Sequence, residues 1–292
     1  ISVHPEHPGK GKGPQYRGGS GATAVNVVGL QKVKNVIESM HAFVEQVYIP
    51  DTLAIASFYK DWGKQGEGIG NFMTYGDFPA KGMDDVGSFL VPRGVILNRD
   101  LSKIHEVDLN ADDQIQEYVA HSWYDYRGGK EQGLHPYKGE TALNYSGPKP
   151  PYEHLDTDKS YSWLKSPRWK GKAMEVGPLA RMLMLYATGN KQAKELVNYT
   201  LKKLDLPVTA LYSTLGRTAA RTLETKIFVD AIGLYAPLHD VGEMDLPERI
   251  LLKPSRLDAA EWDIMKSHTV RGRAMVDEAI AACTRVLNDR SE

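Results

Sequence analysis

Cysteine is almost absent from this sequence, because Cys283 is the only one in 292 residues. A single thiol can form neither an internal disulfide nor a metal clip made of two cysteines. Any redox or metal chemistry in this chain must therefore use histidine and carboxylate side chains, or ligands supplied from elsewhere.

Long apolar runs and an excess of charge are absent as well. No stretch approaches the roughly 18 apolar residues that a membrane-spanning helix needs, and the first residues lack the apolar centre of a signal peptide. We therefore expect no transmembrane segment and no export signal in this chain. Lys and Arg number 36 against 37 Asp and Glu. This balance argues against a nucleic-acid binder that relies on a cationic surface.

What is present is the composition of a folded globular protein, 41% hydrophobic and 25% charged. Such a composition excludes disorder, collagen and coiled coil as descriptions of the whole chain. Residues 1–24 differ, since they are rich in Gly, Lys, His and Pro, and we expect a flexible end there. His4 and His7 lie in this segment and are interpreted as solvated side chains rather than metal ligands.

Hydrophobic periodicity predicts a mainly α fold with a minor β component, an α+β class. Apolar residues recur at helical spacing from Val27 until Pro50, which is expected to end that helix. Short β-prone runs between glycines predict a strand region over 63–100, with hairpin potential between 88–91 and 95–97. Further helices are predicted over 112–126, 177–187, 191–204, 213–232 and 258–268, the last opened by an Asp258/Glu261 capping box.

Two loop features invite a functional interpretation. Gly66, Gly68 and Gly70 have a spacing that could suit a phosphate-binding loop, but no clear strand precedes them and no Gly-Lys-Ser/Thr follows, so support is weak. Residues 127–172 are dense in Gly, Pro and Tyr, and loops of that length in a compact domain are usually functional or packed on something larger.

One metal-ligand pattern is visible, the pair His239-Asp240 followed by His268. Imidazole and carboxylate are ligands that divalent iron, manganese or zinc accepts without thiolates, and such a centre could activate water against a phosphodiester. By spacing alone, a structural role as helix caps is the better interpretation of these side chains.

The surrounding segment, APLHDVGEMDLPERILLKPSRLDAAEWDIMKSH (236–268), resembles the HD-GYP family of metal-dependent cyclic di-GMP phosphodiesterases. The resemblance implies that His239, Asp240 and His268 match three metal ligands of that family, which would hold divalent Fe or Mn. Glu243 stands where the family usually has a phosphate-contacting lysine, and it would repel an anionic substrate. The family's later ligands and GYP loop do not occur. We therefore expect an incomplete, all-α, cytoplasmic-type piece over 234–292.

A larger resemblance covers residues 25–233. It is carried by YIPDTLAIASFYKDWGKQGEGIGNF (48–72), EYVAHSWYDY (117–126), KSYSWLKSPRWKGKAMEVGPLAR (159–181) and STLGRTAARTLETK (213–226). These segments resemble the large subunit of NiFe hydrogenases, above all the membrane-associated uptake group. The resemblance implies dihydrogen oxidation, an iron-sulfur small subunit as partner, and membrane association through that subunit.

The same resemblance implies a specific set of ligands for the NiFe centre. In the family, four cysteine thiolates from two CxxC motifs hold the NiFe centre, and this sequence contains neither motif. We therefore assign no nickel or iron ligand to any residue here and expect the chain to be inactive by itself.

Individual side chains in these segments also have structural interpretations. Large aromatic residues would anchor a loop on a core, namely Tyr161, Trp163 and Trp169. Arg168 is interpreted as a buried ion-pair partner, and Glu175 as a charge favouring the start of the helix at Gly177. His121 and Trp123 are expected near the end of the 112–126 helix.

Taken together, the sequence predicts a fusion of a partial hydrogenase domain, 25–233, with a partial HD-GYP-like domain, 234–292. Residues 230–237 show no linker at the join, which favours an accidental junction over an evolved two-domain protein. Because the helix over 27–48 would normally pack against further hydrogenase segments, we expect its apolar face to be exposed.

Overall fold

A computed structural model describes residues 27–79, 85–138, 141–149, 154–235, 247–251, 257–267 and 271. The chain forms two compact units, one of residues 44–227 and one of residues 1–43 together with 228–292. The N-terminal segment expected to be flexible and most of the 234–292 segment lie outside the described residues.

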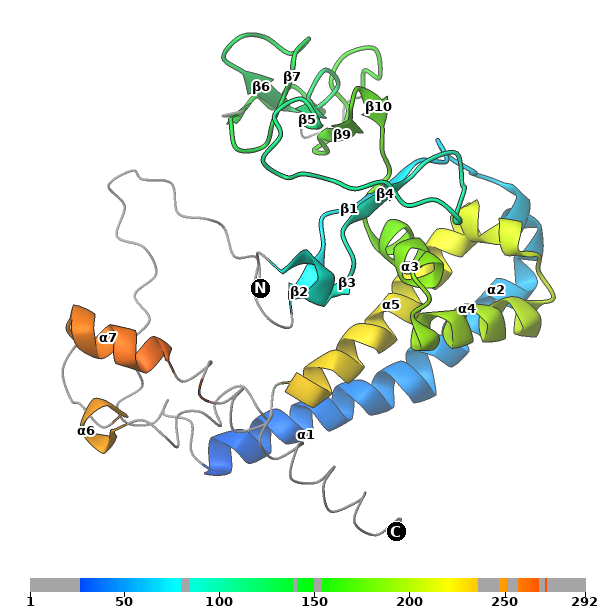
Figure 1. The fold of residues 1–292 in the computed structure, drawn as a ribbon. Coiled ribbons are helices and arrows are strands. Elements are labelled where there is room, and N and C mark those ends of the chain that lie inside the picture. The colour runs from blue at the N-terminus through cyan, green and yellow to red at the C-terminus, as the bar shows by residue number, and fades with distance from the viewer. Residues whose placement is uncertain are drawn as a thin grey trace. The chain divides into compact units, whose positions relative to one another are not determined.

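The larger unit contains most of the helical elements and every strand that the described residues form (Figure 1). Its helical elements are η1 (Val44–Tyr48), α2 (Ile49–Phe58), η2 (Lys60–Lys64), η3 (Val86–Ser88), α3 (Pro178–Ala187), α4 (Lys191–Leu204), η4 (Val208–Tyr212) and most of α5 (Thr214–Tyr235). The predicted helices over 177–187, 191–204 and 213–232 are thereby confirmed.

Local signals explain where α3 and α4 begin and end. Pro178 opens α3 directly after Gly177, whose φ of 110° is a conformation that glycine adopts readily. The Asn190 side chain caps α4 by accepting a hydrogen bond from the Ala193 amide. Asp205, in the left-handed region, ends α4.

Pro50 does not end the first helical region, which corrects the prediction from the sequence. The π-helical turn η1 precedes α2, and Pro50 occupies the first turn of α2, where a missing backbone N–H leaves no helical hydrogen bond unmade. The chain therefore stays helical through Phe58.

The strands of the described residues are short and entirely antiparallel. They are β1 (Phe72–Thr74), β2 (Asp77–Pro79), β3 (Phe89–Val91), β4 (Gly94–Ile96), β5 (Ile115–Tyr118), β6 (Tyr124–Tyr126), β7 (Gly133–Leu134), β8 (Thr141–Leu143), β9 (Ser166–Trp169) and β10 (Lys172–Ala173). They form pairs β1-β4, β2-β3 and β6-β8 and a sheet of order β10-β9-β5-β7.

Two expectations about these strands are wrong in part. The strands predicted at 88–91 and 95–97 exist, but they form no hairpin with each other, because β3 pairs with β2 and β4 pairs with β1. The β component also reaches beyond 63–100, since β5 to β10 lie between residues 115 and 173. The long segment after residue 127 is thus partly strand.

The helix predicted over 112–126 is wrong, since this segment forms β5 and β6 instead. Ile115, Val119 and Trp123 are all buried and lie four residues apart, a spacing that resembles one face of a helix. Pairing of β5 with β7 on one side and β9 on the other decides the backbone conformation, and the spacing reflects two short strands joined by a turn.

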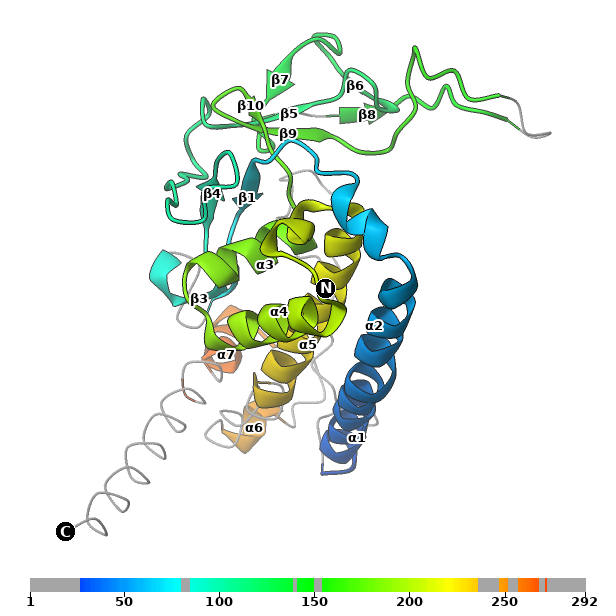
Figure 2. The same ribbon diagram turned by 90° about the vertical axis from the view of Figure 1, so that its right-hand side faces the viewer.

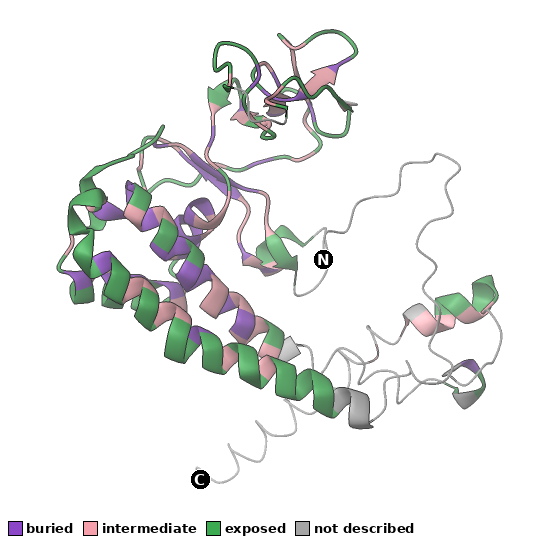
Figure 3. Cartoon of the chain, turned by 180° about the vertical axis from the view of Figure 1, so that it is seen from behind, coloured by how far each residue is buried: buried purple, intermediate pink, exposed green. Residues whose placement is uncertain are grey.

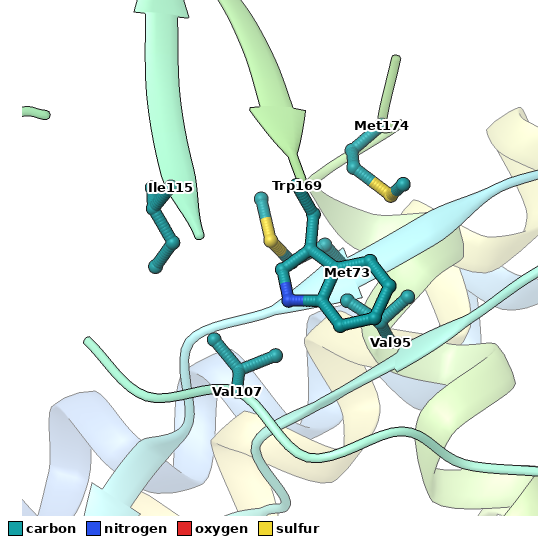
Figure 4. Packing of buried hydrophobic residues seen from close by; sticks show 6 residues of the cluster. All are labelled: Met73, Val95, Val107, Ile115, Trp169 and Met174. Carbon is teal, nitrogen blue, oxygen red and sulfur yellow. The ribbon is translucent and has the colours of Figure 1, made fainter. Parts of the chain in front are cut away.

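A core cluster holds the β1-β4 pair against the four-stranded sheet. Trp169 of β9 lies among apolar side chains from several strands and loops (Figure 4). The cluster consists of Met73, Val95, Val107, Ile115, Trp169 and Met174. Burying each of these large side chains contributes about 1.5–3 kcal/mol to folding.

Helix α3 is the buried helix of the larger unit. It contacts β1, β3 and α4 (Figure 2), and six of its ten residues are buried. A helix that is apolar almost all round is characteristic of a core position. Through α3, the sheet region and the helices share one hydrophobic core.

The described part of the smaller unit consists of α1 (Val27–Phe43), the end of α5, α6 (Glu248–Leu251) and α7 (Ala259–Lys266). The predicted Asp258/Glu261 capping box is confirmed at the start of α7. Large apolar side chains of α1 are exposed (Figure 3), as expected for this helix, namely Val33, Val36, Met40 and Phe43. Within the described residues, no helix is both long enough and apolar enough to cross a membrane.

Candidate functional site

The residues predicted to bind a divalent metal, His239, Asp240 and His268, lie outside the described residues. The same is true of Glu243 and of Cys283. The metal centre therefore stays a prediction, and the contacts of the described residues gather in the segments that carry the larger resemblance.

The glycine-rich loop after η2 is the first component of this site. Gly66, Gly68 and Gly70 have φ angles of 73°, 68° and 74°, in the left-handed region that favours glycine. A Cβ atom at Gly66 would lie 2.3 Å from the Thr214 Oγ1, and one at Gly68 would lie 2.5 Å from an Arg217 nitrogen. The loop thus needs glycine both for its backbone and for the close approach of α5.

Arg217, in the first turn of α5, is the centre of the site. Its guanidinium forms two hydrogen bonds of 2.7 Å with the Glu175 carboxylate. The same group donates to the Tyr212 carbonyl at 2.8 Å and to the Gly66 carbonyl. A bidentate guanidinium–carboxylate pair is both strong and geometrically specific, so Arg217 fixes the loop and Glu175 in one arrangement.

Arg99 holds the opposite end of the loop. Its guanidinium lies 2.9 Å from the Glu67 carboxylate and 5.1 Å from the centre of the Tyr212 ring. Its backbone amide donates to the Gly70 carbonyl at 2.8 Å. Burial raises the pKa of Tyr212, while the positive charge of Arg99 opposes that rise. Tyr212 therefore stays an uncharged ring against which Arg99 stacks.

Asn71 completes the connections between segments. Its side-chain oxygen accepts from the Asn98 amide at 3.0 Å, and its side-chain nitrogen donates to the Ala173 carbonyl at 3.2 Å. Its carbonyl accepts from the Glu175 amide at 2.8 Å. We call the meeting point of residues 65–73, 97–99, 173–175 and 212–217 the glycine junction.

The charged side chains of the glycine junction hold protein segments together. The Arg217 guanidinium is occupied by protein oxygens, and the Glu175 carboxylate is neutralised by it. The loop leads into strand β1 rather than a helix, so it lacks the helix N-terminus that a phosphate-binding loop uses. The arrangement positions four segments, and the charged side chains Arg99, Glu67, Arg217 and Glu175 bind each other in pairs.

A second ion pair ties α3 to α5. Arg181 and Glu224 form two hydrogen bonds, and the one between the Arg181 Nη2 and the Glu224 Oε2 is 3.1 Å long. The side chain of Glu224 is only 8% exposed. Hydrogen bonding to Glu224 raises the pKa of Arg181 above its ordinary value, so the guanidinium stays protonated.

Two of the predicted structural roles need correction. Glu175 does not act mainly on the start of α3, because its carboxylate binds Arg217. Arg168 has no carboxylate partner in the described part of the chain, and its guanidinium lies 5.3 Å from the centre of the Tyr118 ring. The charge of Arg168 is thus stabilised by an aromatic face rather than by an ion pair.

The aromatic residues divide into buried and exposed groups. Trp169 is in the core, as the anchor interpretation predicts. Trp163 and Tyr161 are about half exposed, and Trp163 packs edge-on against the buried Trp123. The ring of His121 stacks on Tyr161 and its Nδ1 lies 3.1 Å from the Lys159 carbonyl, so the imidazole belongs to a surface loop rather than to a helix end.

Reasoning from the sequence did not identify the four residues that organise these contacts, namely Arg99, Arg181, Arg217 and Glu224. A signal was present for two of them, since Arg217 and Glu224 lie seven residues apart in one predicted helix and so face the same side. Their partners are 42 and 43 positions away, and local spacing does not reveal contacts at such separations.

Comparisons with known proteins agree with this arrangement. The family model described as nickel-dependent hydrogenase matches residues 9–267. This match continues past residue 234, where the resemblance to HD-GYP proteins begins. The uptake hydrogenase large subunit of Rhizobium leguminosarum bv. viciae is 46% identical over a match that covers 71% of this chain and 36% of that protein.

Two further relatives extend the comparison. The uptake hydrogenase large subunit of Azotobacter chroococcum mcd 1 is 35% identical, over 90% of this chain and 47% of that protein. The solved [NiFeSe]-hydrogenase of Dm. baculatum is 28% identical with a TM-score of 0.53, over 73% of this chain and 40% of that chain. The chain thus spans less than half the length of these relatives.

Proposed function

This chain belongs to the nickel-dependent hydrogenase family, and from that premise we propose that it forms the central part of the large subunit of an uptake hydrogenase. In the whole enzyme, dihydrogen is oxidised and the electrons pass to an iron-sulfur small subunit. We also propose that the assembled enzyme associates with a membrane through that small subunit.

One observation carries the proposal, namely that the segments with the hydrogenase resemblance meet in space. Gly66 from the first segment, Glu175 from the third and Arg217 from the fourth meet at the glycine junction. The second segment contributes Glu117 and Tyr118 of β5, which pair with Pro167 and Ser166 of β9 in the third. Segments that are far apart in the chain thus support one scaffold, as an intact internal part of the family fold requires.

The donor set does not fit the family's NiFe centre. That centre requires soft thiolate ligands, and the sequence has a single cysteine, which lies outside the described residues. At the glycine junction the charged groups are guanidinium and carboxylate, and they bind each other. We derive no step of dihydrogen cleavage from these residues and propose that this chain is inactive by itself.

The first experiment measures nickel by elemental analysis of the purified chain and dye reduction under dihydrogen. We expect neither bound nickel nor turnover. Stoichiometric nickel together with dihydrogen-dependent dye reduction would show that the chain is active alone and would overturn this part of the proposal.

The second experiment tests the role of the segment within a whole enzyme. The matched region of the Rhizobium leguminosarum large subunit is replaced by the corresponding residues of this chain, and the hybrid is produced with its small subunit. We expect dihydrogen oxidation to be retained, and to be lost when the hybrid carries Arg217→Leu. A hybrid that folds and binds its small subunit but never oxidises dihydrogen contradicts the proposed function.

The HD-GYP-like segment supports an alternative activity that stays a prediction. Its motif would use His239, Asp240 and His268 to bind divalent Fe or Mn and hydrolyse cyclic di-GMP. The hydrogenase family match, over residues 9–267, includes His239 and Asp240 and so competes with this alternative. Release of linear dinucleotide by the wild type with manganese, lost in His239→Ala, would favour this alternative; no release would dismiss it.

A further inference from the structure

A groove lies between α2 and α4 in the larger unit. Its volume is about 580 Å³. Its walls are Ile49 and Leu53 of α2 and Leu196 and Tyr199 of α4, and Leu223 of α5 also lines it. Helices α2 and α4 contact each other, and both lie close to α5 in Figure 2. The groove is therefore bounded by helices.

Helix α5 forms one wall of the groove and is joined to the neighbouring helical segment by two side-chain contacts. The hydroxyl oxygens of Thr52 and Thr222 lie 3.0 Å apart, and the Lys226 ammonium lies 3.1 Å from the Glu45 carboxylate. The first contact joins α2 to α5 and the second joins η1 to α5, so the continuous helical segment of η1 and α2 runs antiparallel to α5. The helices that line the groove are thus held in place by contacts between their side chains.

The lining favours polypeptide over a small polar molecule. Small-molecule sites usually place a few polar groups so that they converge on the ligand. Here the Ser57 hydroxyl donates to the Ala54 carbonyl at 2.6 Å, and Glu45 is paired with Lys226. Lys203 is exposed near the end of α4. The walls are otherwise apolar, and what they can recognise is an apolar surface.

The dimensions of the groove suit a helix. Ile49, Leu53 and Ser57 lie four residues apart on α2 and present one face over two helical turns. That face is about 12 Å long at 1.5 Å per residue. Ile55 and Phe58 of α2 are also exposed, at 61% and 84%, so α2 bears unburied apolar surface outside the groove as well.

We propose that this groove receives an amphipathic helix from the part of a hydrogenase large subunit that this chain does not match. The inference rests on the proposed function. The chain covers 36% and 47% of two curated relatives, so more than half of each relative's polypeptide is available to cover surfaces of this segment. A second copy of this chain, bound in the groove, would instead make the chain form a dimer through this surface.

The test uses the full chain produced together with tagged polypeptides that comprise the remaining parts of the Rhizobium leguminosarum large subunit. We expect the chain to be captured by the tag, and amide hydrogen exchange to slow at residues 49–57 and 196–204. The exposed groove positions are changed in Ala54→Glu and Tyr199→Glu, which add a charge without removing core side chains. Each variant should weaken capture about tenfold or more, because the charge would be buried without a partner.

Tyr137→Glu is the matched control, because Tyr137 is 70% exposed and does not line the groove. It should leave capture unchanged. Capture that Ala54→Glu and Tyr199→Glu leave unaltered overturns the groove proposal, while the activity of the hybrid enzyme still reports on the proposed function. Light scattering that shows a dimer of the chain alone, dissolved by the same two variants, would identify a second copy as the occupant and also overturn the proposal.

Discussion

At the scale of single residues, Gly68 shows why the loop of the glycine junction contains glycine. Its backbone has φ of 68°, and the space where a side chain would start is filled by the Arg217 guanidinium. A side chain at this position would be disfavoured both by the backbone conformation and by the close approach of Arg217. The two costs can be separated, because Gly171 has φ of 75° but no neighbour within 4 Å of its Cβ position.

We predict that Gly68→Ala destabilises the fold more than Gly171→Ala. The backbone cost alone is about 1 kcal/mol, and displacement of Arg217 from Glu175 should add about 1–3 kcal/mol. Denaturant unfolding followed by circular dichroism measures both variants. Equal losses of unfolding free energy would mean that the contact with Arg217 contributes nothing.

Tyr75 is the residue whose ionisation the fold changes most clearly. Burial raises its pKa to about 12, and the negative charge of Glu117 adds to the rise. The unfolded chain loses this proton at a lower pH than the folded chain. The stability that Tyr75 supports is therefore complete below pH 10 and is lost as pH rises from 10 to about 12.

The predicted alkaline loss attributable to Tyr75 is about 3 kcal/mol, since a pKa difference of one unit corresponds to about 1.4 kcal/mol. Tyr75→Phe should remove most of this loss, leaving a smaller one because burial also raises the pKa of Tyr126 and Tyr212. Unfolding free energies measured across the alkaline range test this, with the exposed Tyr137→Phe as control. An unchanged profile in Tyr75→Phe would exclude Tyr75 as the source.

At the scale of elements, the ion pair between α3 and α5 joins the buried helix to the long helix that carries Arg217. Glu224 is nearly buried, whereas the Lys191–Glu195 pair on α4 is exposed at 90% and 67%. Removing one partner of a buried pair leaves a charge with little water to replace it. Exposed pairs contribute little because water and salt screen them.

Glu224→Gln should therefore lower the unfolding free energy by about 2–4 kcal/mol, and Glu195→Gln by less than about 0.5 kcal/mol. Glutamine keeps the shape of glutamate, so the difference reports on charge rather than on packing. Thermal and denaturant unfolding of both variants provide the measurement. A small effect of Glu224→Gln would show that α3 and α5 are held together by apolar packing alone.

At the scale of the whole chain, the described surface contains large apolar side chains of a kind that folded proteins usually bury. On β8 and the loop before β9, Leu143 and Leu164 are 75% and 77% exposed, and Tyr145 stacks on Trp163 nearby. Exposed apolar surface of this kind marks contacts with other polypeptide. The same explanation applies to the stripe on α1 within the smaller unit.

We predict that the purified chain binds a hydrophobic fluorescent dye and that Leu143→Ser together with Leu164→Ser reduces this binding. Both side chains are largely exposed, so the secondary structure should not change. Dye fluorescence and circular dichroism of the wild type and the double variant are compared. A single Ile104→Ser change, at a less exposed position, is the control and should have a smaller effect.

The sequence by itself determined the elements whose signals are local. Helical periodicity, the Asn190 and Asp258 caps and Pro178 after Gly177 fix α3, α4, α5 and α7, because each of these signals acts within one or two turns. The hydrogenase resemblance, which the family match now supports, likewise came from contiguous segments.

Only the tertiary structure decided what depends on distant partners. The segment 112–126 has a helix-like spacing of buried residues but becomes β5 and β6, because β7 and β9 pair with β5 and β8 pairs with β6. Glu175 binds Arg217 rather than the start of α3, since folding brings α5 within 2.7 Å of it. The reason is the same in both cases: contacts with residues outside the local segment can override local preference when the partner satisfies a buried backbone or charged group.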